Sequence, residues 1–376
     1  MSEPVEFYWG NAHLTGASCD FRSDAITTPS LGTLHAISKA TLNDDVYGED
    51  ETTRHFEEHI ARICGKEAAA FVVSGTMANQ LSLCALAQAP CSILADATAH
   101  IIHFEAGGVA NLSGATVHPV RPSNGHYLTL EDIQKHAAVG PVALERCPVT
   151  IVSLENTAHG NVIPLHELRA IKAWTDGQGI AVHIDGARIW HAVAGGGGSL
   201  KDLAACCDAM TLCFGKGLAA PIGAAVVGAA SLVRRVKQLR QSIGGGVRKV
   251  GPMAAAAWQA VLDSFGPGSV DVRGVLRSTH DTARGLAEMW TSLGGKFLRR
   301  VETNLIWLDL KDIGVEKAAF NDLACRHKVR VRAPRIVVHP QISPAALYRL
   351  GLVFHEVMAS KLDIHGSGSD GIASKL

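Results

Sequence analysis

The feature that most limits how this chain can fold is the alternation of short apolar runs with helical patterns through its middle. Such runs are typical of strands buried on both faces, which occur in parallel sheets covered by helices. We therefore expect an α/β fold built on a mostly parallel sheet. The expected strands are residues 69–73, 92–96, 150–154, 180–185 and 209–214.

The pattern changes beyond residue 251. A long helical stretch from residue 252 leads to a strand at 303–309, and residues 329–332 and 335–338 resemble two more strands. Helices mixed with strands favour a second, smaller α+β domain. We expect four parts: an N-terminal arm (1–20), a large domain (21–255), a small C-terminal domain (256–362) and a flexible tail (363–376).

Composition narrows the class of protein. The 376 residues are 47% apolar and 19% charged, with no net charge, which suits a water-soluble globular chain. The balance argues against a nucleic-acid partner, which favours a basic surface. No apolar run reaches the roughly 18 residues that a membrane span needs. The nine cysteines lack the spacing of a metal site, so we expect reduced thiols and no metal.

The chain ends in Ser374, Lys375 and Leu376. This tripeptide at the extreme C-terminus is a peroxisomal address, and the Gly/Ser-rich stretch 366–371 would present it as a flexible tether. The alternative is a chance occurrence, in which case the expected location is the cytoplasm. We expect delivery to the peroxisome by its import receptor.

Two turns after expected strands carry groups suited to an anionic aromatic ligand. Ser74, Gly75 and Thr76 follow one strand and begin a helix, where backbone N–H groups can bind phosphate. Asp185 ends another strand, where an acid can pair with a protonated pyridine nitrogen, and the fork of the nearby Arg188 suits a carboxylate. Taken singly, a helix cap and a surface salt bridge are the favoured explanations of these residues.

A third turn places Lys216 between Gly215 and Gly217, directly after an apolar strand. Desolvation at such a position lowers the pKa of an amine and makes it nucleophilic toward an aldehyde. An ordinary solvated lysine is the alternative. The three turns occurring together, in this order, favour the functional interpretation.

With these features the chain resembles the threonine aldolase branch of the beta-eliminating lyases, and some fungal alanine racemases resemble that branch too. The resemblance extends over about residues 20–345, with the motifs in family order. It implies the fold-type-I pyridoxal-phosphate architecture, which is similar to aspartate aminotransferase. The matching stretches are 21–24, 44–50, 74–80, His100, 104–108, 153–157, 185–188, 216–218, 244–248 and 335–339.

The resemblance implies pyridoxal 5'-phosphate as cofactor and a homodimer or homotetramer with shared active sites. Lys216 would form the Schiff base, Asp185 would face the pyridine nitrogen, and His100 would stack on the ring opposite the lysine. The other cofactor-binding residues would be Gly75, Thr76, Arg188 and Arg248, the last from a neighbouring subunit. The substrate-binding residues would be Ser23, Tyr47, Arg188 and Arg335.

The reaction is left open between two classes. The expected activity is cleavage of a β-hydroxy-α-amino acid, such as L-threonine or L-allo-threonine, into glycine and an aldehyde. The alternative is racemisation of L-alanine in secondary metabolism. Departures from the family pattern put the aldol-specific groups in doubt: Gln241 replaces a basic residue, Glu145 replaces a histidine, Gly215 replaces a serine, and Ala158-His159-Gly160 replaces an Asn-Gly continuation.

Overall fold

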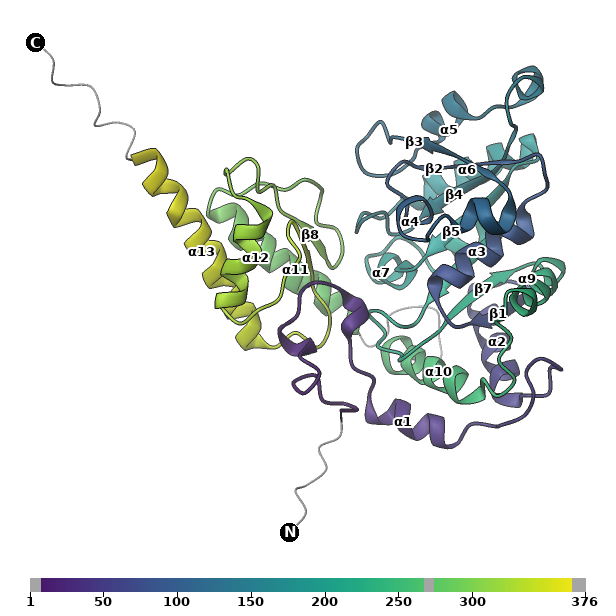
Figure 1. Cartoon of the computed structure of the whole chain (residues 1–376), viewed down its shortest axis with the longest axis horizontal. Coiled ribbons are helices and arrows are strands. Elements are labelled where there is room, and N and C mark those ends of the chain that lie inside the picture. Colours follow the sequence, from purple (N-terminus) through teal and green to yellow (C-terminus); the bar gives the residue numbers. More distant parts are fainter. Residues whose placement is uncertain (1–7, 267–273, 367–376) are drawn as a thin grey trace, which may run out of the picture. The chain divides into compact units, whose positions relative to one another are not determined.

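The computed structural model describes residues 8–266 and 274–366. They form two compact units, one within 29–277 and the other made of the described parts of 1–28 and 278–376 (Figure 1). These limits differ from the expected 21–255 and 256–362, because the N-terminal segment groups with the C-terminal one. The expected limits of independently folding domains stay a prediction.

The larger unit is built on a seven-stranded sheet of order β1-β7-β6-β5-β4-β2-β3. The strands from β6 to β3 are parallel to their neighbours, whereas β7 is antiparallel to both β1 and β6. The expected mostly parallel sheet is therefore confirmed. The strands are β1 (Ala68–Val72), β2 (Ser92–Asp96), β3 (Thr116–Val120), β4 (Val149–Glu155), β5 (Ala181–Gly186), β6 (Ala209–Cys213) and β7 (Ala224–Gly228).

Two of these strands were not expected. β3 is an edge strand with largely exposed residues, among them His118 and Pro119, so it lacks an apolar run. β7 is fully buried and apolar, but its short alanine-rich run differs little from the helical sequence that follows it. The sequence signal is weak in both cases because neither strand has the usual composition of a buried parallel strand.

Helices cover both faces of the sheet, and alternate strand residues join different cores. In β1, Phe71 packs into the main core with α2 and α10, whereas Ala70 and Val72 pack into a separate cluster with α3 and α9. The helices of this unit are α1 (Leu31–Ser38), α2 (Glu51–Cys64), α3 (Gly75–Leu86), α4 (His100–His103), α5 (Leu130–His136), α6 (Leu165–Gln178), α7 (Ile189–Ala194), α8 (Leu200–Ala205), α9 (Ala230–Ser242) and α10 (Gly251–Phe265), with single turns at Val109–Ser113 and Gly140–Leu144.

The parallel strands end at one edge of this sheet. β2 ends at Asp96 and β4 at Glu155, which lies opposite Asp185 of β5 in the strand register. β6 ends two residues before the Gly215-Lys216 turn. Carboxyl ends of adjacent parallel strands are where ligands bind in open α/β sheets.

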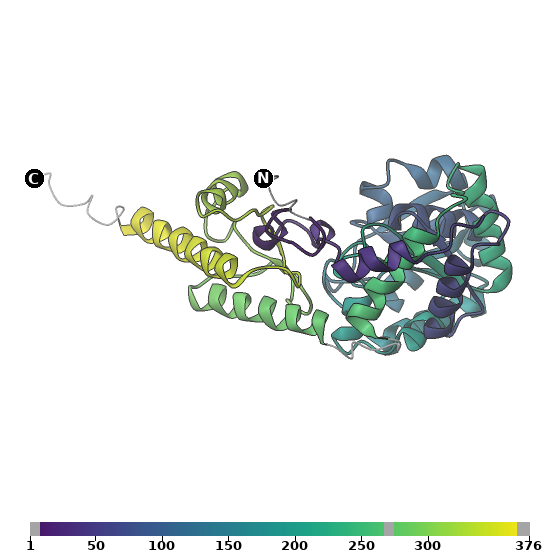
Figure 2. The ribbon, with the colours of Figure 1, turned by 90° about the horizontal axis from the view of Figure 1, so that it is seen from below.

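The smaller unit has a two-stranded antiparallel sheet, β8 with β9, packed against helices. Its core contains Phe21, Trp290, Phe320 and Phe354, and α12 and α13 lie side by side (Figures 1 and 2). Its elements are β8 (Leu305–Trp307), β9 (Arg335–Val337), α11 (Val275–Ser292), α12 (Lys317–Arg326), α13 (Pro344–Gly366) and the turns Ala17–Cys19 and Asp24–Ile26.

One expected strand of this unit is wrong. Residues 329–332 form only isolated bridges, from Arg330 to Asp20 and from Arg332 to Arg335. Val329 and Val331 are buried while the two arginines are exposed, which produces the two-residue period of a strand. The chain turns back at Pro334 before a ladder can form.

In the described part of the chain, no helix combines the length and apolarity that crossing a bilayer would require. The C-terminal tripeptide lies outside the described residues, so peroxisomal delivery stays a prediction.

Candidate active site

A buried carboxylate, Glu105, connects α4 to α3 at the edge where the parallel strands end. Its Oε1 accepts hydrogen bonds from His100 Nδ1 at 2.7 Å and from Asn79 Nδ2 at 2.9 Å. Its Oε2 accepts a hydrogen bond from Gln80 Nε2 at 2.5 Å. The residue is 4% exposed, so these donors replace the water that a carboxylate would otherwise bind.

Asn79 joins this carboxylate to Asp185. Its Nδ2 donates to Asp185 Oδ2 at 2.7 Å as well as to Glu105. Its Oδ1 accepts from Thr211 Oγ1 at 3.0 Å, and Asp185 Oδ1 accepts from the Ala187 N–H at 2.9 Å. The amide is therefore bonded at both ends, and Asp185 is fixed in the strand-end turn.

The strand ends bring the predicted residues His100, Asp185 and Lys216 into one region. The ligand atoms of His100, Glu105 and Asp185 lie within 4.8 Å of one another. The hydrogen bond to Glu105 raises the pKa of His100, and the charges of Glu105 and Asp185 add to it against burial and the charge of Lys216. Hydrogen bonds account for the close approach of these atoms, and we assign no metal to them.

Lys216 follows β6 in a turn in which Gly217 has little room for a side chain. A Cβ added to Gly217 would lie 2.9 Å from His191 Nε2, which is too close for a real contact. The Lys216 carbonyl accepts the Ala219 N–H at 2.8 Å, which closes the turn, and the lysine is only partly exposed.

The first turn of α3 lies at the same edge. Ser74 is its N-cap, with Oγ accepting the Met77 N–H at 3.1 Å. Gly75 and Thr76 follow, and N–H groups in a first turn have no partner within the helix. Both the helix-cap and the phosphate interpretations are compatible with this geometry, because the cap uses the side chain and leaves backbone donors.

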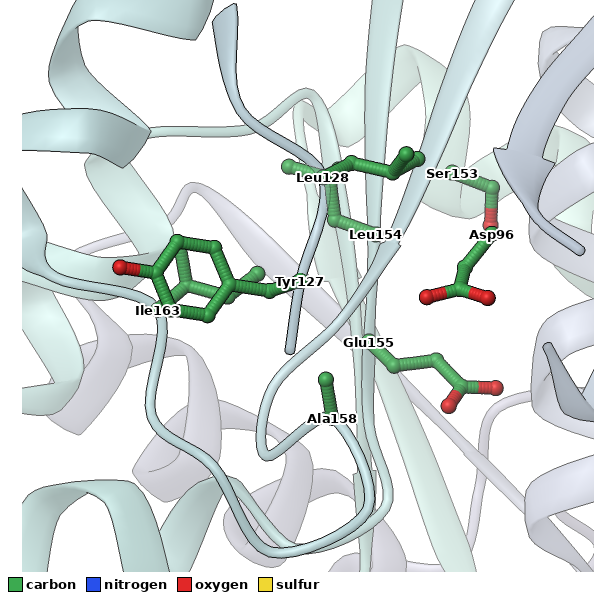
Figure 3. Close-up of a pocket in the computed structure, with 8 residues that line it drawn as sticks. All are labelled: Asp96, Tyr127, Leu128, Ser153, Leu154, Glu155, Ala158 and Ile163. Atoms are coloured by element: carbon green, nitrogen blue, oxygen red, sulfur yellow. The ribbon is translucent and has the colours of Figure 1, made fainter. Parts of the chain in front are cut away.

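Two further acids, Asp96 and Glu155, end β2 and β4 and line a small pocket (Figure 3). Glu155 Oε1 accepts the backbone N–H of His100. Burial, followed by the charges of Asp185 and Asp96, raises the pKa of Glu155 to about 8. The pocket is lined by Asp96, Tyr127, Leu128, Ser153, Leu154, Glu155, Ala158 and Ile163.

His159 lies beside this pocket in a left-handed conformation, with φ of 52°. Its Nε2 is 2.8 Å from Thr98 Oγ1, which in turn donates to Asp96 Oδ1 at 2.7 Å. The departure from the family pattern at position 159 thus places an imidazole at the strand ends, tied to the segment that carries His100.

Tyr47 and Arg248 lie together on the surface of the larger unit. Arg248 pairs with Asp44, and its guanidinium lies 5.3 Å from the centre of the Tyr47 ring. Tyr47 is 71% exposed. Nearby, the Gln241 side chain lies against Gly246, where an added Cβ would meet its Oε1 at 1.8 Å.

The other predicted residues are spread over the two units. Arg188 is the N-cap of α7, three residues after Asp185. In the smaller unit, Ser23 Oγ accepts the Ala25 N–H, and Arg335 donates to the Arg22 carbonyl and lies over the Trp307 ring. Glu145, at the position expected of a histidine, is exposed after a short turn.

Sequence reasoning missed Asn79, Glu105 and Glu155 as members of this site. All three lie inside the matching stretches 74–80, 104–108 and 153–157, but the resemblance assigned them no role. A signal was available: Asn79 and Gln80 are adjacent polar residues in an otherwise apolar stretch of α3, where unpaired amides are costly. Such residues need partners, and here their partner is Glu105.

Comparisons with known proteins agree with this geometry. The sequence profile described as Beta-eliminating lyase matches residues 20–313. The chain is similar to Alanine racemase TOXG of Cochliobolus carbonum, with 46% identity over 93% of this chain and 90% of the relative. It is also similar to Aldolase vrtJ of Penicillium aethiopicum (43%, covering 93% and 88%) and to the Low specificity L-threonine aldolase of Saccharomyces cerevisiae (38%, covering 94% and 89%). The solved structure of Leishmania major threonine aldolase has the same fold, with a TM-score of 0.73, 17% identity and coverage of 90% and 99%.

Proposed function

Because this chain belongs to the beta-eliminating lyase family, whose members use pyridoxal 5'-phosphate, we propose that it cleaves a β-hydroxy-α-amino acid into glycine and an aldehyde. The observation that carries the proposal is the buried network that joins His100 to Asp185 at the strand ends, beside Lys216. The family fold and this network support a cofactor site at this edge of the sheet, and the aldolase relatives support the reaction.

The residues present fit the cofactor. Asp185 is a buried carboxylate whose two oxygens are oriented by Asn79 and Ala187, which suits a protonated pyridine nitrogen. The first turn of α3 offers N–H groups for a phosphate, and Lys216 offers an amine for an aldehyde. When bound, the cofactor supplies an electron sink for the pair released at Cα of the amino acid.

The roles that we propose are those that the family resemblance implies. Lys216 binds the cofactor aldehyde, and its amine moves a proton at Cα on one face. Asp185 keeps the pyridine nitrogen protonated, and His100 covers the opposite face of the ring. Gly75 and Thr76 bind the phosphate. Arg188 orients the substrate carboxylate, and the family resemblance gives the same role to Ser23 and Arg335.

Cleavage of Cα–Cβ also needs a base within hydrogen-bond reach of the β-hydroxyl. Glu145 is exposed at the position that we aligned with a family histidine, so we look for the base elsewhere. His100 and His159 are imidazoles that lie at the strand ends, and we propose that one of them accepts the hydroxyl proton.

A second candidate is racemisation of a small amino acid such as L-alanine. The relative at 46% identity is described as an alanine racemase. Racemisation needs a proton donor or acceptor on each face of Cα, and a protonated His100 opposite Lys216 supplies the second face. The same residues thus support either reaction, and the position of the substrate bond relative to the ring decides between them.

One experiment distinguishes the two. The holoenzyme is incubated in deuterated water with L-alanine, L-threonine and L-allo-threonine in separate reactions. Acetaldehyde and glycine from the hydroxy amino acids, with alanine unchanged, support the aldolase. D-alanine carrying deuterium at Cα, with little acetaldehyde, overturns it in favour of the racemase. Lys216→Ala should abolish both reactions and the visible absorption of the lysine-bound cofactor.

We further propose a homodimer or homotetramer in which Tyr47 and Arg248 reach a neighbouring active site, since both are exposed on one surface of the larger unit. Light scattering of the purified chain tests the assembly. We also propose peroxisomal delivery through Ser374, Lys375 and Leu376. A fluorescent fusion that keeps this C-terminus free should enter peroxisomes and lose that location when the three residues are removed.

A further inference from the structure

Glu105 is a buried carboxylate that the proposed function does not use. The side chain has no exposed surface, whereas the His100 side chain bonded to it is 45% exposed. Three side-chain N–H donors from α3 and α4 point at its two oxygens. A buried carboxylate is costly unless it is fully hydrogen-bonded. This cost indicates that Glu105 has a role beyond packing.

The contacts fix the His100 ring at one nitrogen. Nδ1 lies 2.7 Å from Glu105 Oε1, and since an ionised carboxylate only accepts, Nδ1 carries the hydrogen. The other nitrogen, Nε2, is then the one that can take up or release a proton. The backbone of the same residue is held by its N–H bond to Glu155 Oε1, so both the ring and its main chain are anchored to acids.

A single amide extends this anchoring to the strand end. Asn79 Nδ2 donates to Glu105 Oε1 at 2.9 Å and to Asp185 Oδ2 at 2.7 Å. A rotation of the Glu105 carboxylate therefore disturbs the His100 ring and the Asp185 carboxylate together. Asn79 cannot turn freely in response, because its Oδ1 accepts the Thr211 hydroxyl.

We propose that Glu105 is a positioning residue, which orients the His100 ring through Nδ1 and couples that orientation to Asp185 through the Asn79 amide. The inference rests on the proposed function in one respect only, that His100 and Asp185 face the cofactor. The hydrogen bonds belong to the chain itself, so they can be tested without turnover.

The charge of His100 reports this contact. The titratable groups around the ring are Glu105, Asp185 on β5, Lys216 after β6 and Glu155 at the end of β4. Glu105 is the main cause of the raised pKa of His100, while burial and Lys216 act in the opposite direction. Replacing Glu105 by glutamine removes its charge and keeps its shape, so the pKa of His100 should fall by about one unit or more.

The experiment follows carbethoxylation of His100 by diethyl pyrocarbonate, which reacts with neutral imidazole. The full chain, prepared without cofactor, is treated between pH 5 and 8, and tandem mass spectrometry quantifies His100 and His103 in one peptide. His103 is an internal control because its Nε2 contacts the Ala97 carbonyl rather than an acid. Glu155→Gln is the matched variant, because that acid contacts the His100 backbone and not the ring.

In the unaltered chain, half-maximal reaction of His100 should require a pH above the ordinary value of about 6.5. In Glu105→Gln that pH should fall by about one unit, with His103 unchanged, and in Glu155→Gln it should move less. Circular dichroism establishes that each variant is folded. A midpoint at or below the ordinary value in the unaltered chain overturns the proposal, even if Glu105→Gln does not fold.

The holoenzyme supplies a second measurement that a purely structural role would not move. In Glu105→Gln, the midpoint of the pH–rate limb that reflects His100 should move to lower pH by a similar amount. The value of kcat should fall by a larger factor than KM changes. An altered carbethoxylation profile together with no turnover on any amino acid would leave Glu105 as the residue that orients His100 and would contradict the proposed reaction instead. An unchanged carbethoxylation profile would contradict the role of Glu105 itself.

Discussion

The larger unit contains two clusters of charged side chains that differ in how much of each side chain is buried. At the strand ends, the carboxylates of Glu105 and Asp185 are buried and share the Asn79 amide. Between residues 44–45 and helix α9 with its following loop, two neighbouring acids pair with two arginines in contrasting ways. Asp45 and Arg240 are buried, with 5% and 6% of their side chains exposed, whereas Arg248, the partner of Asp44, is 61% exposed.

The comparison shows that burial determines whether an ion pair contributes to the stability of the fold. Breaking a buried pair strongly destabilises the fold, because it leaves one charge buried without its partner. An exposed pair contributes little to stability and is available to a ligand or a second subunit. Adjacent residues of one motif therefore serve different purposes, and a matched pair of substitutions can separate them.

Asp45→Asn should cause the largest loss of stability. It leaves the buried guanidinium of Arg240 without its carboxylate, and breaking a buried pair costs about 3–5 kcal/mol. Asp44→Asn is the matched control and should leave the free energy of unfolding unchanged, because its partner is exposed. Urea unfolding at pH 7 measures both variants, and equal losses would contradict the distinction between the two pairs.

Glu155→Gln should change how stability depends on pH. The folded pKa of Glu155 is about 8, above its unfolded value of about 4.3, so only the folded state keeps this proton between those values. The contribution of Glu155 to the stability of the unaltered chain therefore falls as pH rises through this window, by an amount on the order of a few kcal/mol. Glutamine has no titrating proton, so the free energy of unfolding of the variant should rise relative to that of the unaltered chain from pH 5 to 8. Urea unfolding measures this free energy, and a difference between the two chains that stays constant across this range would contradict the raised pKa of Glu155.

Asn79→Ala should cost about 1–3 kcal/mol, because two buried carboxylates and the Thr211 hydroxyl lose a partner. Ser82→Ala on the same helix is the control. Ser82 is also fully buried, and in the part of the chain that the structure describes its hydroxyl has no hydrogen-bond partner, so its removal should change little. Thermal unfolding compares the two variants, and the contribution of the amide would be in doubt if they behaved alike.

Arg248→Met should have the smallest effect on folding and should act instead on the cofactor. The free energy of unfolding should stay the same, while the affinity for pyridoxal 5'-phosphate should fall about tenfold if this arginine reaches a phosphate. Lys249→Met, an exposed neighbour, is the control. Equilibrium titration of each variant with the cofactor measures the change, and equal affinities would remove Arg248 from the phosphate site.

The sequence predicted the residues of the site better than the hydrogen bonds that join them. Asp185 and Lys216 were identified because each follows a buried strand, and parallel strands bring their carboxyl ends to one edge. The Asn79–Glu105 and Asn79–Asp185 bonds span 26 and 106 residues. No local pattern reports such a bond, because it depends on how α3 is rotated against the sheet.

The same reason explains the errors in secondary structure. The period-two pattern of residues 329–332 describes which side chains are buried, and it was correct in that respect. A strand needs a ladder partner as well, and the turn at Pro334 removes it. In the opposite sense, β3 has a partner in β2 but lacks the apolar pattern because it lies at the edge.

By itself the sequence determined the fold class through its hydrophobic periodicity, and it indicated the family and the cofactor through motifs that resemble the threonine aldolase branch. Only the tertiary structure decided which carboxylates share a hydrogen-bond donor, which of two adjacent aspartates is buried, and that burial raises the pKa of Glu155. Those properties depend on burial and on distances between segments remote in the chain, and packing sets both.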